Sequence, residues 1–344
     1  MRIFRGKSLP LSAKSSKTMK RITGIGNALT DVLARVNDEK VLDMLALPKG
    51  SMQLIDDSRL PDIRCAMQQM TVSRATGGSA GNTMLALANL GAAPTFIGKV
   101  GDDETGRFFA DNATQKGIRP VLVQSTLPSG IAHTFITPDG ERTFATYLGA
   151  AGDMQADDLS ETMLDDCDYL YLEGYLVQNH PLIRRAIELA KARGVKVCLD
   201  LASYNIVEAD HAFFTELVTE YVDVVFANEE EARAFTGKEA EEALQELGKL
   251  CEVAVVKMGK RGSAILCQGE TTFVESMEVS HVVDTTGAGD FYAAGVMYGL
   301  LNGWDMKRCA QAGSLLAGNV IQVIGTTLPE EVWKQINEEI KKNG

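Results

Sequence analysis

The sequence predicts an α/β fold in which helices cover both faces of a mostly parallel sheet. The main observation is a regular alternation of strand-like and helix-like segments that begins at Tyr169. Parallel strands need a crossover connection, most often a helix, so this alternation predicts a parallel sheet. The expected segments are strands at 169–173, 195–201, 222–227 and 253–257, and helices at 181–193, 209–220 and 229–235.

A second observation predicts a small β-sheet lid beside this main sheet. Two runs of alternating polarity, 131–137 and 142–147, flank the hairpin turn Pro138-Asp139-Gly140-Glu141. Inserted hairpins often project from α/β folds. We therefore expect residues of about 31–36, 51–55 and 121–147 to form the lid, within one domain that covers residues 21–344.

Composition and charge favour a small-molecule site. The 344 residues carry a formal net charge of −12, with a sequence pI near 4.9. Nucleic acids and anionic membranes prefer a basic face, so neither is expected as a partner. The six cysteines form no Cys-x-x-Cys pair, which predicts reduced thiols in a cytoplasmic protein. No apolar run reaches the ~20 residues of a membrane span, so we expect a soluble protein. We expect it to be a monomer or a homodimer. Residues 1–20 are basic and Ser-rich, and we expect a disordered tail, which could be an upstream start.

The stretch Val283-Asp284-Thr285-Thr286-Gly287-Ala288-Gly289-Asp290 carries the strongest chemical signal, because it runs into an apolar helix-like segment. Small residues at a helix start expose several N–H groups and form an anion cradle. Carboxylates beside such a cradle suit a base or a cation ligand, which indicates phosphoryl transfer. No Gly-Lys-Ser/Thr follows, and Tyr292 replaces the third glycine of a dinucleotide fingerprint.

Two further groups of polar residues are candidate ligands. Gly77 and Gly78 allow close approach of the backbone, and Asn82 lies one turn inside the helix that follows. Asn27 and Asp31 follow the first buried strand. The alternative interpretations are a capped packing helix for the first group and a fixed turn for the second.

Arg142, directly after the hairpin turn, also permits two interpretations. It is either an exposed charge on a strand or a guanidinium directed at a phosphate group. The residue pattern alone favours the exposed charge. The second interpretation makes Arg142 a catalytic candidate.

The motifs resemble those of the PfkB (ribokinase-like) carbohydrate and nucleoside kinase family over about residues 21–328. Asp284-Thr285-Thr286-Gly287-Ala288-Gly289-Asp290 resembles its C-terminal signature, and Gly77-Gly78-Ser79-Ala80-Gly81-Asn82 with Gly98-Lys99-Val100-Gly101-Asp102-Asp103 resembles its N-terminal one. Asn228-Glu229-Glu230-Glu231 resembles the family's Asn-x-x-Glu motif. The resemblance implies a ribokinase-like three-layer α/β/α fold with a β lid, and ATP-dependent phosphorylation of an alcohol group.

The resemblance also implies residue roles. Asp290 is implied as the base, with Gly287, Ala288 and Gly289 as the anion hole. The resemblance places Mg²⁺ at Glu231 through water and a monovalent cation such as K⁺ at Asp284 and Thr286. The implied ATP-binding residues are Asn228, Lys257, Gly259, Gly262 and Asn319.

The acceptor remains open between two kinds of molecule. Gly26-Asn27-Ala28-Leu29-Thr30-Asp31 resembles the adenosine-kinase branch, in which this Asp holds ribose hydroxyls and this Asn contacts the base. Gly77, Gly78 and Asn82 complete the implied sugar site. The Gly-Glu-Arg-Thr turn fits a free-sugar kinase (ribose, fructose or 2-keto-3-deoxygluconate) equally well. A catalytically silent nucleotide-binding regulatory protein would not need the base Asp290, and a dinucleotide oxidoreductase would need a third glycine near the first strand.

Overall fold

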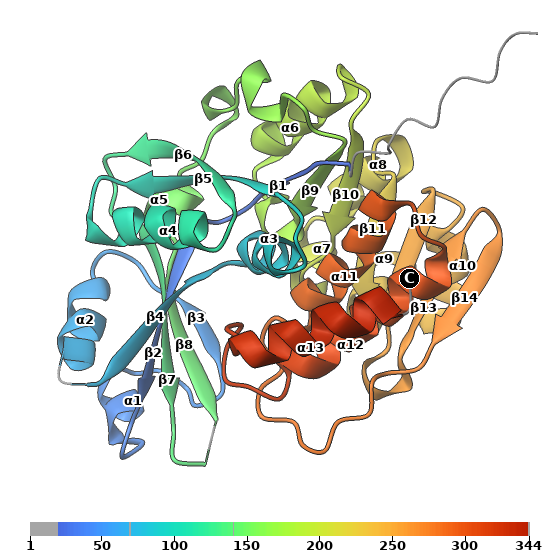
Figure 1. Cartoon of the computed structure of the whole chain (residues 1–344). Coiled ribbons are helices and arrows are strands. Elements are labelled where there is room, and N and C mark those ends of the chain that lie inside the picture. The colour runs from blue at the N-terminus through green and yellow to red at the C-terminus, as the bar shows by residue number, and fades with distance from the viewer. Residues whose placement is uncertain (1–19, 69, 140, 343–344) are drawn as a thin grey trace, which may run out of the picture.

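The computed structural model describes residues 20–68, 70–139 and 141–342. Figure 1 shows a large α/β body and a small sheet that projects from one side of it. The predicted disordered tail lies outside the described residues except for Lys20.

Within the described residues, nine strands form the large sheet in the order β14-β13-β12-β11-β10-β9-β1-β5-β6. Strands β6 to β12 of this order pair in parallel, and only β13 and β14 are antiparallel. This confirms the mostly parallel sheet. The bounds are β1 (Ile22–Ile25), β5 (Thr95–Gly101), β6 (Arg119–Ser125), β9 (Tyr169–Glu173), β10 (Lys196–Asp200), β11 (Val224–Asn228), β12 (Val253–Lys257), β13 (Ser263–Cys267) and β14 (Glu270–Val274).

Helices cover both faces of the large sheet (Figure 1). Their bounds, with those of the helices near the small sheet, are α1 (Lys40–Met44), α2 (Leu60–Gln68), α3 (Ser79–Asn89), α4 (Glu104–Gln115), α5 (Gly149–Gly152), α6 (His180–Lys191), α7 (Tyr204–Ala209), α8 (His211–Glu220), α9 (Glu229–Thr236), α10 (Ala240–Leu247), α11 (Ala288–Asn302), α12 (Met306–Val320) and α13 (Glu330–Lys342). Short 3₁₀ turns lie at η1 (Ala156–Asp158), η2 (Glu161–Leu164), η3 (Gly174–Leu176) and η4 (Gly259–Arg261).

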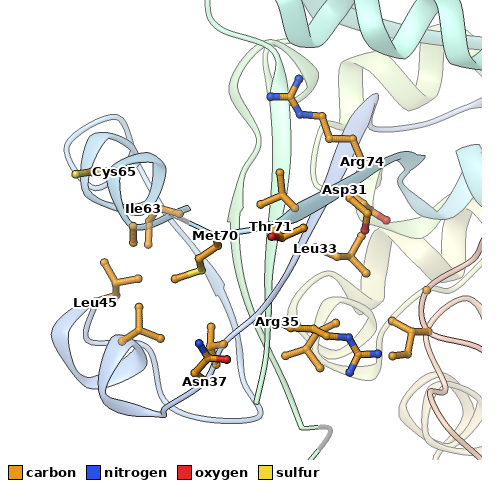
Figure 2. A pocket seen from close by; sticks show the side chains of 18 of the residues that line it. Asp31, Leu33, Arg35, Asn37, Leu45, Ile63, Cys65, Met70, Thr71 and Arg74 are labelled. Atoms are coloured by element: carbon orange, nitrogen blue, oxygen red, sulfur yellow. The ribbon is translucent and has the colours of Figure 1, made fainter. Parts of the chain in front are cut away.

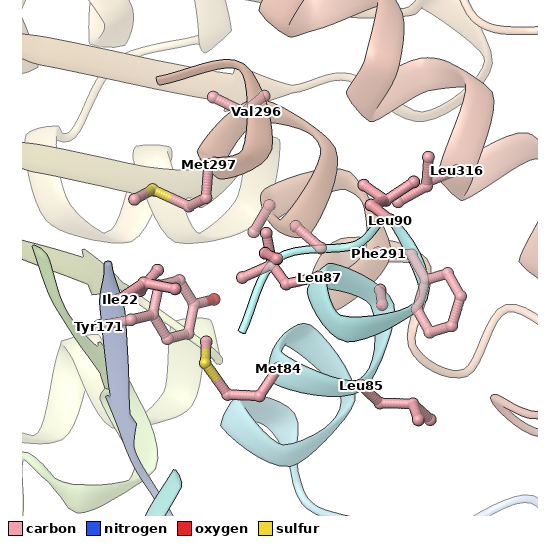
Figure 3. Packing of buried hydrophobic residues seen from close by; sticks show 14 of the residues in the cluster. Ile22, Met84, Leu85, Leu87, Leu90, Tyr171, Phe291, Val296, Met297 and Leu316 are labelled. Carbon is pink, nitrogen blue, oxygen red and sulfur yellow. The ribbon is translucent and has the colours of Figure 1, made fainter. Parts of the chain in front are cut away.

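Strand β9 shows how the sheet divides two hydrophobic cores. Tyr171 belongs to the core that contains α3 and α11, whereas Leu170 and Leu172 belong to the core under α6 and α8. Successive side chains of a strand point to opposite faces, so an all-apolar strand supplies both cores. Figure 3 shows Met84 of α3 and Phe291 of α11 in the first core. The packing of α3 against α11 brings the starts of these two helices together.

The small sheet has the order β3-β8-β7-β2-β4 and carries α1 and α2 on its outer face. Its strands are β2 (Leu29–Arg35), β3 (Met52–Leu54), β4 (Val72–Gly77), β7 (Gly130–Ile136) and β8 (Arg142–Tyr147). Val32 and Ala34 are buried in the lid's own core, while Asp31 and Leu33 are half-buried on the opposite face. The alternation along β2 therefore directs Asp31 towards the large body.

The lid differs from the predicted segment list at two places. Residues 121–125 belong to β6, which pairs with β5 in the large sheet, and β4 is a lid strand that the sequence analysis did not identify. Within the large body, the first four residues of the motif at 98–103 belong to β5. The helix predicted at 209–220 is α8, whereas α7 and α10 were not predicted.

None of the described helices combines the length and the apolar character needed to cross a membrane.

Candidate active site

The glycine-rich stretch forms the predicted turn into α11. Gly287 has a φ of 75°, which favours glycine, and it directly precedes the first helical residue Ala288. A Cβ atom on Gly287 would also lie 2.5 Å from Cγ2 of Thr326. Both conformation and space therefore require glycine here. Free N–H groups and the positive end of the helix dipole meet at this point, which makes the turn suitable for an anion.

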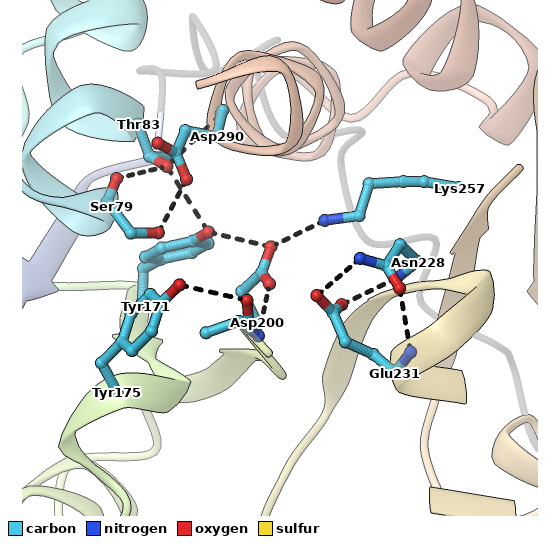
Figure 4. Close-up of polar contacts among 10 residues, drawn as sticks. Ser79, Thr83, Tyr171, Tyr175, Asp200, Asn228, Glu231, Lys257 and Asp290 are labelled. Atoms are coloured by element: carbon cyan, nitrogen blue, oxygen red, sulfur yellow. Dashed lines mark hydrogen bonds and ion pairs between the residues drawn. The ribbon is translucent and has the colours of Figure 1, made fainter. Parts of the chain in front are cut away.

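Asp290 lies in the first turn of α11 and faces the start of α3 (Figure 4). Its Oδ1 accepts a hydrogen bond from Ser79 Oγ at 2.7 Å, and its Oδ2 accepts one from Asn82 Nδ2 at 2.9 Å. The Asn82 side-chain oxygen in turn accepts a hydrogen bond from Thr326 Oγ1 at 3.1 Å, which fixes the amide orientation. The Asp290 carboxylate is therefore held in one position by two donors.

Burial raises the pKa of Asp290 to about 6. The two hydrogen bonds favour the ionised form and oppose this effect, the Asp200 carboxylate raises the pKa further, and Lys257 lowers it. A carboxylate with a pKa near the working pH can accept a proton and release it again. The geometry and the pKa together suit a general base.

Asp31 approaches the same space from the lid. Gly77 permits this approach, because a Cβ atom there would lie 2.2 Å from Asp31 Oδ1. Burial and the nearby Asp290 raise the pKa of Asp31 to about 7, and Arg142 opposes the shift. Gly78 has a φ of 83°, and a Cβ atom on it would lie 2.3 Å from the Asn27 carbonyl oxygen. Both glycines are therefore required by close contacts.

A cavity of about 1300 Å³ joins these groups. The predicted site residues that line it are Asp31, Gly78, Asn82, Asn228, Glu231, Lys257, Gly259, Gly262, Thr286, Gly287, Ala288, Gly289 and Asp290. Asp31 also lines an adjoining cavity of about 1540 Å³, in which Leu33 and Arg35 form one wall and α1 and α2 lie opposite (Figure 2). Predicted residues that do not line the first cavity are Asn27, Gly77, Arg142, Asp284 and Asn319.

Asn27 has a structural partner instead of a place on the cavity wall. Its backbone N–H and its side-chain Nδ2 both donate to Glu173 Oε1, at 2.9 and 2.6 Å, and Ala80 N donates to Glu173 Oε2 at 2.9 Å. Burial raises the pKa of Glu173 to about 7, against the effect of these donors. The Glu173 carboxylate thus links the end of β1 to the start of α3, and the structure does not bring the Asn27 amide to the predicted ligand.

Arg142 contacts the glycine-rich loop directly. Its Nη1 lies 2.6 Å from Asp284 Oδ2 and 3.3 Å from Thr286 Oγ1. Its side chain is only 9% exposed, so it is not the surface charge that the residue pattern favoured. Within the described part of the chain, its buried Nη2 has no hydrogen-bond acceptor. The lid therefore presents a spare guanidinium N–H group beside the anion cradle.

The monovalent-cation role implied for Asp284 and Thr286 does not fit this arrangement. Asp284 Oδ1 accepts from Thr286 N at 3.0 Å, and Oδ2 accepts from Gly325 N at 2.7 Å while it pairs with Arg142. A cation there would have to compete with a buried guanidinium. The positive charge next to Asp284 comes from the lid in this structure.

Asn228 and Glu231 form the start of α9 at the other end of the cavity. Asn228 N and Nδ2 donate to the Glu231 carboxylate at 2.8 and 2.7 Å, and Glu231 N donates to Asn228 Oδ1 at 2.9 Å. Burial raises the pKa of Glu231 to about 7. Mg²⁺ that accompanies phosphates needs only one or two carboxylates and keeps several waters. The pair therefore fits a water-mediated Mg²⁺ site.

Asn319 lies outside the cavity wall and bonds within its own helix. Its Nδ2 donates to Leu315 O at 2.8 Å. Gly259 and Gly262 line the cavity with φ values of 53° and 98°, as a tight turn after β12 requires. The structure thus keeps the glycines of the predicted nucleotide groove and separates Asn319 from it.

Several residues at the site were not assigned a ligand or catalytic role from the sequence. Ser79 belongs to the motif at 77–82 but was given no role of its own in binding or catalysis, and its hydroxyl group donates to Asp290. Asp200 and Glu173 end strands β10 and β9. A carboxylate at the carboxyl end of a buried parallel strand is a usable signal, because ligands bind at that edge of the sheet.

The glycine-rich turn, the Asp290 carboxylate beside it and the mostly parallel sheet are the features expected of a phosphotransferase that acts on an alcohol group. Residues 50–333 match the family model described as pfkB family carbohydrate kinase, and the chain belongs to this family. The family match, together with the solved structures described next, confirms the ribokinase-like fold.

Similar proteins include kinases of sugars and of nucleosides. The 5-dehydro-2-deoxygluconokinase of Bacillus subtilis (strain 168) is 29% identical over 300 residues, which cover 83% of this chain and 91% of the relative. Adenosine kinase 2 of Arabidopsis thaliana is 26% identical, with 93% and 99% covered. The structure of the adenosine kinase from Sinorhizobium meliloti superposes with a TM-score of 0.82 at 33% identity, covering 94% of this chain and all (100%) of that one. The probable sugar kinase from Rhizobium etli CFN 42 gives a TM-score of 0.82 at 32% identity, with 94% and 99% covered.

Proposed function

We propose that the protein transfers the γ-phosphoryl group of ATP to the hydroxymethyl group of a ribonucleoside such as adenosine. The observation that carries this proposal is that Asp31 of the lid and Asp290 of the body line one cavity. One carboxylate can hold two neighbouring hydroxyl groups while the other removes the proton of a third. A ribose ring offers this arrangement of hydroxyl groups.

The lid wall beside Asp31 suits a nucleobase. Leu33 lies two residues further along β2 and therefore on the same face. Thr134 of β7 pairs with both Leu33 and Phe144, which places Phe144 in the same row. An apolar wall next to a hydroxyl-binding carboxylate matches a molecule with a planar apolar part and a polyol part.

Asp290 acts as the base in this proposal. As the acceptor oxygen attacks the γ-phosphorus, its proton passes to Asp290, and the bond between the γ-phosphorus and the oxygen of the leaving ADP breaks. Gly287, Ala288 and Gly289 hold the charge of the transferring group with backbone N–H groups and the positive end of α11. Arg142 offers its spare N–H group to the same charge from the lid.

Asn228 and Glu231 are the residues that would hold Mg²⁺ through water, and the ion would neutralise phosphate charge. Lys257, Gly259 and Gly262 line the part of the cavity that we assign to ATP. Asn319 has no place in this proposal, because its Nδ2 donates to Leu315 O within its own helix. No role is proposed for K⁺, because Asp284 is engaged by Arg142.

A sugar acid is the second candidate acceptor. The relative from Bacillus subtilis is a 5-dehydro-2-deoxygluconokinase, and a sugar acid carries a carboxylate. The unpaired Nη2 of Arg142 is a suitable donor for such a group. In that case Asp31 would hold hydroxyl groups of an open or cyclic sugar chain.

A screen of ATP consumption separates these possibilities. The acceptors would be adenosine and other ribonucleosides, ribose, fructose, 2-keto-3-deoxygluconate and 5-dehydro-2-deoxygluconate. We expect the highest kcat/KM with a ribonucleoside. Turnover with a free sugar or sugar acid alone would overturn the nucleoside assignment, and ATP binding without turnover on any acceptor would favour a catalytically silent protein.

A further inference from the structure

Lys257 is a buried cation at the carboxyl end of the large sheet. It is the last residue of β12, and its Nζ donates to Asp200 Oδ2 at 3.1 Å. Asp200 is the last residue of β10, two strands away in the sheet. Their side chains are 14% and 5% exposed, and both residues line the cavity that contains Asp290. Figure 4 shows the Lys257 side chain extended towards Asp200, with Asp290 above them.

The Lys257 ammonium group also lies against the anion cradle. A Cβ atom on Gly289 would be 3.2 Å from Lys257 Nζ. Gly289 is the second residue of α11 and lines the cavity, so a phosphoryl group held at the start of this helix would lie within reach of the ammonium group. An amine in this place supplies a full charge where the backbone supplies only partial charges.

We propose that Lys257 is a catalytic residue that donates a hydrogen bond to the transferring phosphoryl group, and that Asp200 is the positioning residue that holds it there. This inference rests on the proposed phosphoryl transfer from ATP and adds a role to it. During transfer, the new bond from the acceptor oxygen to phosphorus forms as the bond to ADP breaks. The acceptor proton goes to Asp290, and Lys257 keeps its own protons throughout.

The surroundings keep Lys257 charged. Burial alone would lower the pKa of Lys257, but the Asp200 and Glu231 carboxylates raise it above its ordinary value. Asp200 is itself fixed, because Ala202 N donates to its Oδ1 at 3.0 Å and Tyr171 Oη donates to its Oδ2 at 3.5 Å. The pair therefore has little freedom to leave the cradle.

The cavity also needs a positive charge for electrostatic reasons. Asp200 and Glu231 are buried and Asp290 is half-buried on its wall, and each of these carboxylates repels a polyphosphate when ionised. Lys257 offsets part of this repulsion at the point where the γ-phosphoryl group meets the glycine turn. An ion pair that only stabilises the fold would not need to lie on the cavity wall at this point. A catalytic role of Lys257 and a purely structural role of the Lys257–Asp200 pair therefore predict different behaviour of variants.

The direct measurement is the affinity for ATP and for ADP, each with Mg²⁺, determined by calorimetry on the full chain. A group that contacts the γ-phosphoryl makes the protein prefer ATP. In Lys257→Gln we expect this preference to fall by at least roughly fivefold, since a charge-assisted hydrogen bond is lost. We expect kcat to fall on the order of 10- to 10³-fold, with the acceptor KM changed much less. Asp200→Asn, which keeps the shape, should shift both quantities in the same direction by a smaller amount.

The double variant D200N/K257Q separates catalysis from structure. If the pair only stabilises the fold, removing both charges leaves neither unpaired, and the double variant should recover kcat and the preference for ATP. If Lys257 acts on the phosphoryl group, the double variant should be no faster than Lys257→Gln. Recovery would overturn the inference.

Lys99→Gln is the matched control. Lys99 is another buried lysine, 9% exposed in its side chain, and its Nζ lies 2.9 Å from Asp158 Oδ2, away from the cavity wall. Its loss should lower thermal stability and leave the ATP-to-ADP affinity ratio unchanged. An unchanged ratio in Lys257→Gln would overturn the role of Lys257 and leave the proposed function intact. The expected change of ratio, without phosphorylation of any nucleoside, would support the role of Lys257 and reject the nucleoside acceptor.

Discussion

The Ser79 hydroxyl group donates a 2.7 Å hydrogen bond to the Asp290 carboxylate, although the two residues are 211 positions apart in the chain. The bond joins the first turn of α3 to the first turn of α11. Because both helices belong to one hydrophobic core, the packing that stabilises the body also fixes the Asp290 carboxylate. The position of the Asp290 carboxylate therefore depends on the fold of the body and not on the lid.

The pH dependence of kcat/KM should report Asp290. Its pKa is raised to about 6 and the reaction needs the ionised form, so activity should fall as the pH decreases through this value. Ser79→Ala removes a donor that favours the carboxylate, so the acidic limb should move to higher pH. Ser160→Ala, at an exposed serine, is the control. A limb that stays in place or moves to lower pH in Ser79→Ala would contradict this assignment of the base.

Asp31 should make the enzyme selective for ribose over 2′-deoxyribose. A pocket that pairs a hydroxyl group with a buried carboxylate penalises a ligand that lacks the hydroxyl. The 2′-deoxy form of the preferred nucleoside should lose at least roughly tenfold in kcat/KM. Asp31→Ala should erase this preference and lower activity overall. Equal use of both forms by the wild type would remove Asp31 from this role and favour a free-sugar acceptor.

A methyl group on Gly77 should disturb the acceptor site through Asp31. The added Cβ atom would lie 2.2 Å from Asp31 Oδ1, so the carboxylate must move. We expect Gly77→Ala to raise the acceptor KM by at least roughly tenfold, because small displacements of a positioning group are costly. Gly81→Ala is the control, since its Cβ atom would meet only Phe96, at 3.9 Å. Steady-state kinetics that show equal effects of the two substitutions would contradict this explanation.

Arg142 should act on the transferring group more than on acceptor binding. Its Nη2 has no acceptor in the described chain, and its Nη1 pairs with Asp284 beside the cradle. Arg142→Ala should lower kcat by roughly 10- to 10³-fold, with a smaller change in acceptor KM. Arg184→Ala, which breaks an exposed pair with Glu216, should leave both parameters unchanged. An unchanged kcat in Arg142→Ala would make Arg142 a structural partner of Asp284.

Most of the fold could be predicted because its signals are local. The apolar strand 169–173 and its neighbours alternate with helices, so the parallel sheet is visible in the sequence. Strand β4 was missed because it is an edge strand of the lid with a mostly half-exposed or exposed pattern, which leaves no apolar run. Helix α7 was missed because it has only six residues and one buried side chain, Val207, which leaves no helical apolar pattern.

The site was predictable where one short motif supplies several groups. Gly287 and Asp290 lie within four residues, so their chemistry appears together in the sequence. The partners of Asn27 and Asp284 were not predictable, because Glu173 and Arg142 reach them only through the tertiary structure. Contacts with residues distant in the chain thus engage two groups for which the resemblance implied ligand roles.

Asp290→Asn tests the central claim most directly. The substitution keeps the shape of the side chain but removes the base, so kcat with the preferred acceptor should fall on the order of 10²–10⁴-fold. Asp111→Asn, at an exposed aspartate, is the control for the substitution itself. Calorimetry should show that ATP affinity in Asp290→Asn stays close to the wild-type value, because the base acts on the acceptor hydroxyl. Turnover close to that of the wild type would contradict the assignment of Asp290 as the base and the mechanism built on it.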